Sequence, residues 1–267
     1  MALFAFFDEV HKTFEGGKEI LRGLTLSIRR GELLVILGGS GTGKTVLLKH
    51  IVGLNRPDKG RIFIQGVETT NYEESQFQAV RKKIGFLFQN SALFDSMSVF
   101  DNVAYPLQEH TRLSKAEIDK QVMEKLKLVG LEGTDWMMPA KLSGGMRKRV
   151  ALARAVILEP EALLYDEPTT GLDPITTRWV TILMRKIHER LGITSVIVTH
   201  NIQSALAVAD RIAFLYRGRI QFMGTPKEIQ ATGDCVVQEF LRSSHFIWAK
   251  DGLKKSRSAD SSSSPSE

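Results

Sequence analysis

Residues 38 to 45 read Gly38-Gly39-Ser40-Gly41-Thr42-Gly43-Lys44-Thr45, which is the pattern G-x-x-x-x-G-K-[ST]. An apolar run from Leu33 to Leu37 precedes this stretch, and a helical pattern from Val46 to Val52 follows it. Glycines let a loop between strand and helix point successive amide N–H groups at phosphate oxygens, in front of the positive helix end. In such a loop the Lys44 ammonium reaches the β- and γ-phosphates, and the Thr45 hydroxyl ligates Mg²⁺. A glycine-rich turn without function would not account for the flanking strand and helix, so we predict that the chain binds a nucleoside triphosphate.

Length and composition fit a globular protein with one elaborate domain or two modest ones. The 267 residues are 43% hydrophobic and 25% charged. No apolar run approaches the ~20 residues that cross a bilayer. The apolar start from Met1 to Phe7 lacks a basic region and runs into Asp8-Glu9, which favours a first strand over a signal peptide. The lone cysteine, Cys235, excludes an internal disulfide and favours the cytoplasm.

The net charge of +6 and the pI of about 9.4 raise the question of nucleic-acid or membrane-surface binding. The positive charge is local, however. One cluster consists of Lys141, Arg147, Lys148, Arg149 and Arg154, and another lies in the tail at Lys250, Lys254, Lys255 and Arg257. We interpret the clusters as solvated faces and keep nucleic-acid binding as an alternative.

Hydrophobic periodicity predicts strands before residue 38, a helical segment from about 97 to 160, and alternating strands and helices afterwards. Capping signals open helices at Ser114, Ser143, Asp173 and Thr225. Pro106 is expected to end or bend the first helix of the helical segment. Beyond about residue 250 the chain is mostly Lys, Ser and Asp, a composition typical of disorder.

Two adjacent carboxylates follow a predicted buried strand. The alternation of strands and helices after a phosphate loop predicts an α/β fold with a parallel sheet, whose ligands lie at the carboxyl ends of the strands. Asp166 and Glu167 follow the apolar run Leu163 to Tyr165. Successive strand residues point in opposite directions, so we expect Asp166 to hold the Mg²⁺ shell and Glu167 to activate the attacking water. The alternative is a solvated acidic turn.

Over roughly residues 4 to 240, the chain resembles the ATP-binding cassette (ABC) family of transport ATPases. The matching motifs are Phe14 for the adenine-stacking aromatic, the phosphate loop, Gln89 for the Q-loop glutamine, Leu142-Ser143-Gly144-Gly145-Met146 for the signature L-S-G-G-Q, Asp166-Glu167, Gly171-Leu172-Asp173 for the D-loop, and His200 for the switch histidine. Taken alone, Phe14 could be core, Gln89 a polar residue at a strand end and His200 a helix cap.

The resemblance implies an α/β P-loop NTPase, an ABC-type nucleotide-binding domain at 4–240. That domain would have a mostly parallel core sheet, an antiparallel β subdomain and a helical insert at about 97–160, before a tail at 241–267. ATP and Mg²⁺ are the implied cofactors. The implied catalytic residues are Lys44, Glu167 and His200, and the implied metal ligands are Thr45, Gln89 and Asp166. The implied nucleotide contacts are Phe14, Gly38 to Val46, Gln89, Ser143, Gly144, Gly145 and Asp173.

A second glycine-rich helix start, Ser143-Gly144-Gly145, presents free N–H groups to an anion. In the family this motif contacts the γ-phosphate that the other subunit holds. With one cassette in the chain, the resemblance implies a head-to-tail homodimer with two ATP molecules in its interface. Two departures stand out: Met146 replaces the signature glutamine, and Val46 stands where a second hydroxyl residue often follows Thr45. Neither changes Lys44, Asp166 or Glu167, so we expect hydrolysis.

A narrower resemblance concerns transport. The segment from Leu87 to Leu107, Met146 and the run Pro168 to Pro174 are similar to the ATPase subunits of Mla (MCE-linked) phospholipid transporters. This implies a permease partner, an MCE-domain lipid-binding protein, and a peripheral position on the cytoplasmic face of the inner (plasma) membrane. The apolar residues Leu93, Phe94, Met97, Val99 and Phe100 exceed what one helix face buries, which favours a docking surface after Gln89.

Two rival functions remain. An importer of a polar solute would use the same ATPase chemistry. Only the excess of basic residues favours a cassette ATPase that acts on nucleic acid. Such proteins typically carry two cassettes or a long coiled coil after the phosphate loop. Only 99 positions separate Lys44 from Ser143, so we prefer transport and expect no nucleic-acid partner.

Overall fold

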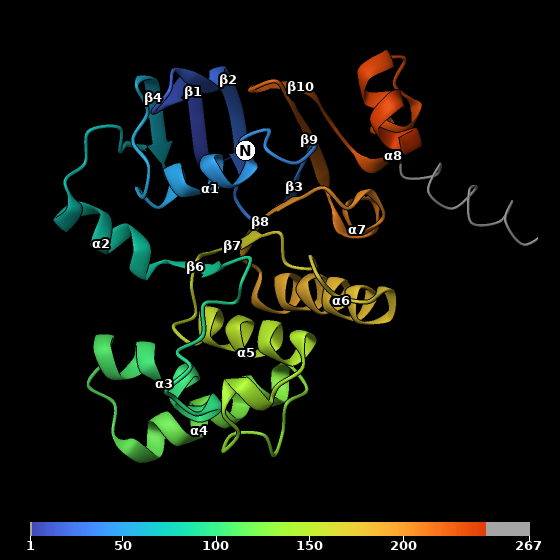
Figure 1. The fold of residues 1–267 in the computed structure, drawn as a ribbon. Coiled ribbons are helices and arrows are strands. Elements are labelled where there is room, and N and C mark those ends of the chain that lie inside the picture. The colour runs from blue at the N-terminus through green and yellow to red at the C-terminus, as the bar shows by residue number, and fades with distance from the viewer. Residues whose placement is uncertain (1, 244–267) are drawn as a thin grey trace, which may run out of the picture.

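The computed structural model describes residues 2–243, in two sheets and a set of helices (Figure 1). The elements, in chain order, are β1 (Leu3–Phe14), β2 (Lys18–Arg29), β3 (Leu33–Leu37), α1 (Lys44–Ile51), β4 (Lys59–Ile64), β5 (Val67–Glu68), α2 (Glu74–Lys82), β6 (Ile84–Leu87), α3 (Val99–His110), α4 (Lys115–Leu128), the 3₁₀ turn η1 (Pro139–Lys141), α5 (Gly144–Val156), β7 (Ala162–Asp166), α6 (Pro174–Leu191), β8 (Thr194–Thr199), α7 (Ile202–Val208), β9 (Arg211–Tyr216), β10 (Arg219–Gly224) and α8 (Pro226–Ala231). Residues 235–243 are also helical. The predicted boundary at about 240 stays a prediction, and the tail beyond 250 lies outside the described residues.

The larger sheet places the carboxyl ends of its strands along one edge. Its order is β10-β9-β3-β8-β7-β6, with antiparallel pairing only between β9 and β10. Strands β3, β7 and β8 are buried at every position, as expected for parallel strands covered on both faces. In the register, Leu37 lies beside Thr199, and Asp166 beside Val198. The phosphate loop, the acidic pair and His200 therefore leave the sheet at the same edge.

Alternate residues of β3 enter two different cores. Leu34 and Ile36 pack with α1 and with the second sheet, whereas Leu33, Val35 and Leu37 pack with the helices on the other face. The side-chain period of two along a strand accounts for this division. Figure 1 shows α1 between the two sheets and α5 and α6 on the opposite side of the core sheet.

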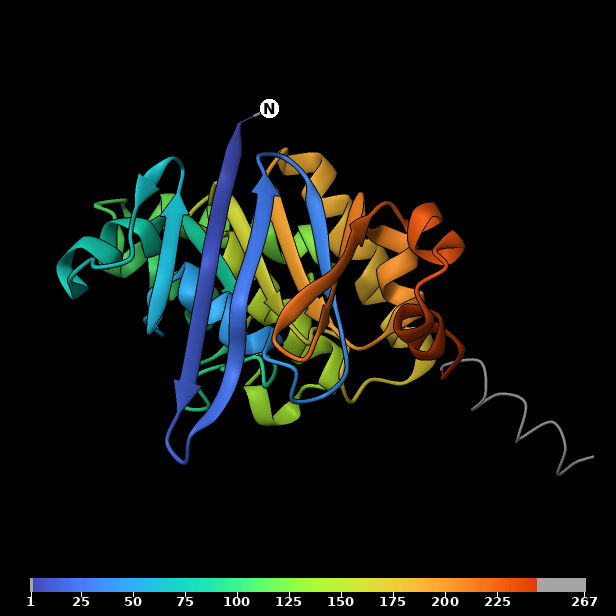
Figure 2. The ribbon, with the colours of Figure 1, turned by 90° about the horizontal axis from the view of Figure 1, so that it is seen from above.

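The smaller sheet is antiparallel, in the order β2-β1-β4-β5. Figure 2 shows its long strands β1 and β2 side by side, running across the core strands. Gly16 and Gly17 close their hairpin with φ values of 87° and 74°, a region that suits glycine. Phe14, at the end of β1, lies directly before this turn, so the hairpin sets the position of its side chain.

Helices α3, α4 and α5 lie between β6 and β7 in the chain, and α3 and α4 form the end of the molecule farthest from the antiparallel sheet (Figure 1). Ser114 and Ser143 cap α4 and α5, as their sequences predict. The helix does not end at Pro106, because α3 continues to His110, and a bend at Pro106 stays a prediction. A proline removes one backbone donor, and the burial of Val103 and Leu107 on either side holds the helix together. No helix within residues 2–243 has the length and apolar character to cross a membrane.

Candidate active site

A cavity of about 570 Å³ lies at the carboxyl edge of the core sheet. Its lining residues are Phe14, Lys18, Ile20, Ser40, Gly41, Gly43, Lys44, Thr45, Val46, Gln89, Glu167, Thr170 and His200. Five separate stretches of the sequence meet here. Most of the predicted nucleotide and catalytic residues therefore share one cavity, and Lys18, Ile20 and Thr170 line it without having been predicted as site residues.

The phosphate loop needs glycine at two crowded positions. Gly43 has φ 104°, and a Cβ atom there would lie 2.8 Å from Ile20 Cγ2. A Cβ atom on Gly38 would lie 2.5 Å from the carbonyl oxygen of Leu215. The buried Lys44 ammonium donates to the carbonyl oxygens of Gly38 at 3.0 Å and Gly39 at 2.8 Å. These bonds hold a cation at the mouth of the loop.

Thr45 and Asp166 place two side-chain oxygens next to each other beside the loop. The Thr45 hydroxyl donates to Asp166 Oδ1 at 2.6 Å. Burial raises the pKa of the Asp166 carboxyl, and the bond from Thr45 opposes this only in part. A partly buried hydroxyl beside a buried carboxylate fits Mg²⁺, which takes one or two protein oxygens and completes its shell with phosphate and water. Within residues 2–243, no cluster of three or more His, Cys, Asp or Glu side chains could hold a metal ion.

Glu167 is held by three side chains. Its backbone leaves β7 with φ 45°, while its N–H still donates to the Val198 carbonyl at 3.0 Å. Glu167 Oε1 lies 3.3 Å from Lys44 Nζ, and Oε2 accepts from Thr170 Oγ1 at 3.2 Å. His200 Nδ1 lies 2.9 Å from Oε2, and because an ionised carboxylate only accepts, His200 donates from Nδ1. The carboxylate is therefore fixed at the cavity wall with a lysine and a histidine beside it.

The structure excludes two of the alternative roles, that of Phe14 as a core residue and that of His200 as a helix cap. Phe14 is 41% exposed on the cavity wall, so it is not a core residue. Asn201, whose side chain accepts from the Ser204 N–H at 2.9 Å, caps α7, so His200 is not the cap. Gln89 lies two residues beyond the end of β6 and lines the cavity. Its carbonyl oxygen accepts a hydrogen bond from Lys148.

The signature residues Ser143, Gly144 and Gly145 and the D-loop residue Asp173 do not line this cavity. Ser143 caps α5 through the Met146 N–H, and the Asp173 carboxylate accepts from the N–H groups of Ile175 and Thr176 at 3.0 Å. In a single chain Ser143 and Asp173 act as helix caps, and Gly144 and Gly145 begin α5. The predicted contacts of these residues with nucleotide stay predictions.

A family profile described as ABC transporter matches residues 21–170, more than half of the chain. The chain belongs to the ABC transporter family. The probable ribonucleotide transport ATP-binding protein mkl of Mycobacterium leprae is 44% identical to this cassette over 227 residues, which are 85% of the chain and 65% of that relative. The cassette thus spans just under two thirds of the length of the mkl relatives it matches. The intermembrane phospholipid transport system ATP-binding protein MlaF of Escherichia coli is 42% identical over 226 residues, 85% of this chain and 84% of MlaF.

Solved structures agree on the cassette fold. The ATP-binding cassette MJ0796, in a dimeric post-hydrolysis state bound to ADP and Pi, superposes with a TM-score of 0.77 at 34% identity, covering 83% of this chain and 98% of that one. CbiO1 of Clostridium perfringens, part of the ABC transporter complex cbiONQ, gives 0.80 at 31% identity, covering 94% and 100%. The predicted fold class is confirmed.

The solvated interpretation of the basic cluster in the cassette is wrong for Lys148, which is only 5% exposed. The helical period offered a signal: Lys148 follows Gly145 by three positions and precedes Leu152 by four, and both neighbours are buried on α5. Composition alone could not show this, because the same cluster contains cations that are solvated.

Proposed function

We propose that this chain is an ATP-hydrolysing subunit that energises a membrane transporter. The observation that carries the proposal is that Lys44, Thr45, Glu167 and His200 line one cavity, with Asp166 hydrogen-bonded to Thr45 behind its wall. A nucleotide-binding site without hydrolysis needs the loop, but it does not need a carboxylate held by both a lysine and a histidine. The ADP- and Pi-bound state of MJ0796, a relative of the same fold, agrees with this chemistry.

The roles of the residues follow from their positions. The phosphate loop and Lys44 bind the triphosphate, and Phe14 offers a ring for the base to stack on. Thr45, Asp166 and Gln89 would hold Mg²⁺, which when bound offsets the charge on the phosphate oxygens. Glu167 accepts the proton of the attacking water, and His200 keeps Oε2 fixed so that the carboxylate faces the cavity.

The proposed working unit is a head-to-tail homodimer. In it, Ser143, Gly144, Gly145 and Asp173 of one chain complete the cavity of the other. Their position outside the cavity of their own chain, at the amino ends of α5 and α6, supports this arrangement. A helix start with free N–H groups suits a phosphate. The dimeric MJ0796 cassette provides an example of such an assembly.

A groove of about 820 Å³, lined in part by Phe88, Ala92 and Phe94 on either side of Gln89 in the sequence, is the proposed permease site. Its apolar lining includes Phe88 and Phe94, which are 36% and 41% exposed, and Tyr105, whose ring meets Phe94 edge-on at 5.0 Å between centroids. A cytoplasmic helix of the permease would fit such a groove. The proposed docking surface contains fewer residues than the sequence predicts, because Val99 is fully buried and Phe100 packs against the core.

We propose phospholipid as the transported substrate and the cytoplasmic face of the inner membrane as the location, with an MCE-domain protein as a further partner. The name of MlaF, which matches over most of both chains, supports phospholipid. The name of mkl supports a second candidate, a ribonucleotide, which is a polar solute. Both candidates use the same ATPase chemistry and differ in the permease that the groove would bind.

Replacing Phe94 with glutamate is expected to abolish binding to the permease while leaving the fold and ATP binding intact. The new carboxylate would lie near Arg154, whose guanidinium carbon is 5.5 Å from the centre of the Phe94 ring, so the fold tolerates it. Copurification with integral membrane proteins should fall at least roughly tenfold. Met123→Glu, at an exposed apolar position on α4 outside the groove, is the matched control and should copurify normally. Loss of solubility and of ATP binding together would mean that Phe94 is a packing residue.

A further inference from the structure

Lys148 is a buried cation that the proposed chemistry does not use. It lies on α5, five residues after Ser143, and its ammonium donates to the carbonyl oxygen of Gln89. Burial lowers the pKa of Lys148, and the charges of Asp166 and Glu167 oppose that shift. A single side chain thus joins the signature helix α5 to the backbone of Gln89, near the carboxylates of Asp166 and Glu167.

The segment that begins at Gln89 has an unfavourable backbone. Ser91 and Ala92 have φ values of 63° and 46°, in the left-handed region that residues other than glycine rarely adopt. Such a conformation persists only where neighbouring contacts hold it. Arg154, also on α5, donates to the carbonyl oxygens of Ser91 at 2.9 Å and Ala92 at 2.7 Å. Two cations of α5 therefore hold the two ends of this short segment.

The segment also connects two surfaces. Gln89 lines the cavity, and Ala92 lines the groove that contains Phe94. Because both anchoring cations are on α5, the segment is tied to the signature helix at both of its ends.

We propose that Lys148 is a positioning residue, which ties Gln89 to the signature helix so that Gln89 is correctly placed in the cavity when Ser143 engages nucleotide. The inference rests on the proposed ATPase function. Lys148 acts through Gln89 and does not itself touch the substrate.

The test compares Lys148→Met, which keeps an unbranched apolar stem without a donor, with Lys148→Arg, which keeps a donor and a charge. The first readout is hydrogen exchange at residues 89–92, where the Ser91 N–H donates to the Phe88 carbonyl. Lys148→Met should raise exchange there about tenfold while the protection of the core strands is unchanged. Turnover should fall roughly 10- to 100-fold with little change in the KM for ATP, because Gln89 is misplaced but the loop is intact.

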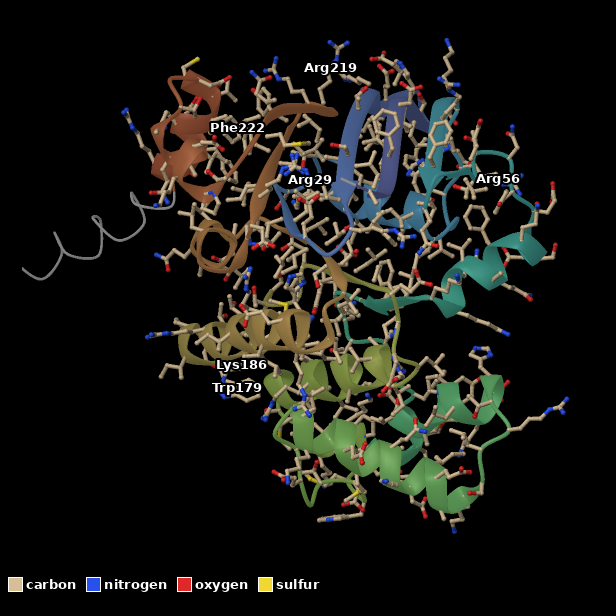
Figure 3. All side chains as sticks on the ribbon, turned by 180° about the vertical axis from the view of Figure 1, so that it is seen from behind. Arg29, Arg56, Trp179, Lys186, Arg219 and Phe222 are labelled. Carbon is tan, nitrogen blue, oxygen red and sulfur yellow. The ribbon has the colours of Figure 1, made fainter. Side chains whose placement is uncertain are left out.

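Lys148→Arg should restore most of both properties. Arg149→Met is the matched control: Arg149 also donates to a backbone carbonyl, of Gly130 at 2.8 Å, and it contacts Trp179, which lies on α6 (Figure 3). It should retain normal turnover and normal exchange at 89–92. If Lys148→Met is insoluble, Lys148→Gln, whose amide is too short for the same bond, takes its place.

Unchanged exchange and turnover in the Met variant would overturn the proposal, and so would a rise in exchange throughout the core, which would mean a purely structural role. The proposed ATPase function fails separately, if the unmodified chain and its partners release no phosphate from ATP. The exchange readout needs no turnover and would still decide whether Lys148 holds the Gln89 segment.

Discussion

Replacing Glu167 with glutamine is expected to lower ATP hydrolysis about 10²- to 10⁴-fold. This corresponds to roughly 2.7 to 5.5 kcal/mol of added barrier. Glutamine keeps the size of the side chain and an oxygen that accepts from His200 Nδ1, but it cannot take a proton from water. Binding of ATP should survive, because the phosphate loop and the Thr45–Asp166 pair are untouched. Phosphate release and ATP binding, measured on the same preparation, separate the two effects.

A matched control for this variant is Glu132→Gln, which removes an exposed carboxylate that does not line the cavity. It should hydrolyse ATP at the normal rate. Near-normal turnover in Glu167→Gln would remove Glu167 from the role of general base. Loss of ATP binding together with turnover would point instead to the 3.3 Å contact with Lys44 as a requirement for the shape of the loop.

The second large effect concerns the proposed cavity that two chains share, with Lys44 from one chain and Ser143 from the other. We expect chains with Lys44→Ala to lack a working phosphate loop and chains with Ser143→Arg to be unable to complete the cavity of a partner. Each variant alone should therefore be almost inactive. In a heterodimer of the two, one cavity combines an intact Lys44 with an intact Ser143, so activity should return on coexpression. With random pairing, about a quarter of the normal rate is expected if a single cavity turns over alone.

Tandem tags on the two variants allow the heterodimer to be isolated before ATPase is measured. The matched control is a heterodimer in which both changes are on the same chain and the other chain is unmodified. There the damaged Lys44 and the damaged Ser143 fall in different cavities, so no cavity is intact. If the mixed pair hydrolyses ATP no faster than the separate variants do, that result would argue that each chain completes its own cavity.

Local signals predicted much of this structure. The helix starts at Ser114, Ser143 and Asp173 occur where capping chemistry placed them, because a cap depends on residues within one turn. The buried runs of β3 and β7 were readable because parallel strands are apolar along their whole length.

The arrangement of the acidic pair was predicted only in part. The opposite directions of Asp166 and Glu167 follow from strand geometry, and Asp166 indeed meets Thr45. The reach of Glu167 toward His200 also depends on its left-handed backbone, with φ 45°. No local residue preference indicates that conformation, since it is imposed by the pairing of β7 with β8 and by the turn that follows.

Other features depend on contacts between distant parts of the chain. The pairing of β1 with β4 brings together segments about fifty residues apart, and a strand as short as β5 has too few residues for a periodic pattern. The burial of Lys148 depends on where the Gln89 carbonyl lies, 59 positions earlier in the chain. Such partners cannot be seen in the sequence around either residue.

Phospholipid transport driven by ATP can be measured after the chain is reconstituted with its copurified membrane partners in liposomes, with a labelled phospholipid and a labelled ribonucleotide followed in parallel. We expect ATP-dependent transfer of the phospholipid, with the Glu167→Gln complex at background and no movement of the ribonucleotide. ATP-dependent movement of the ribonucleotide alone, with the phospholipid stationary, would contradict the proposed phospholipid transport.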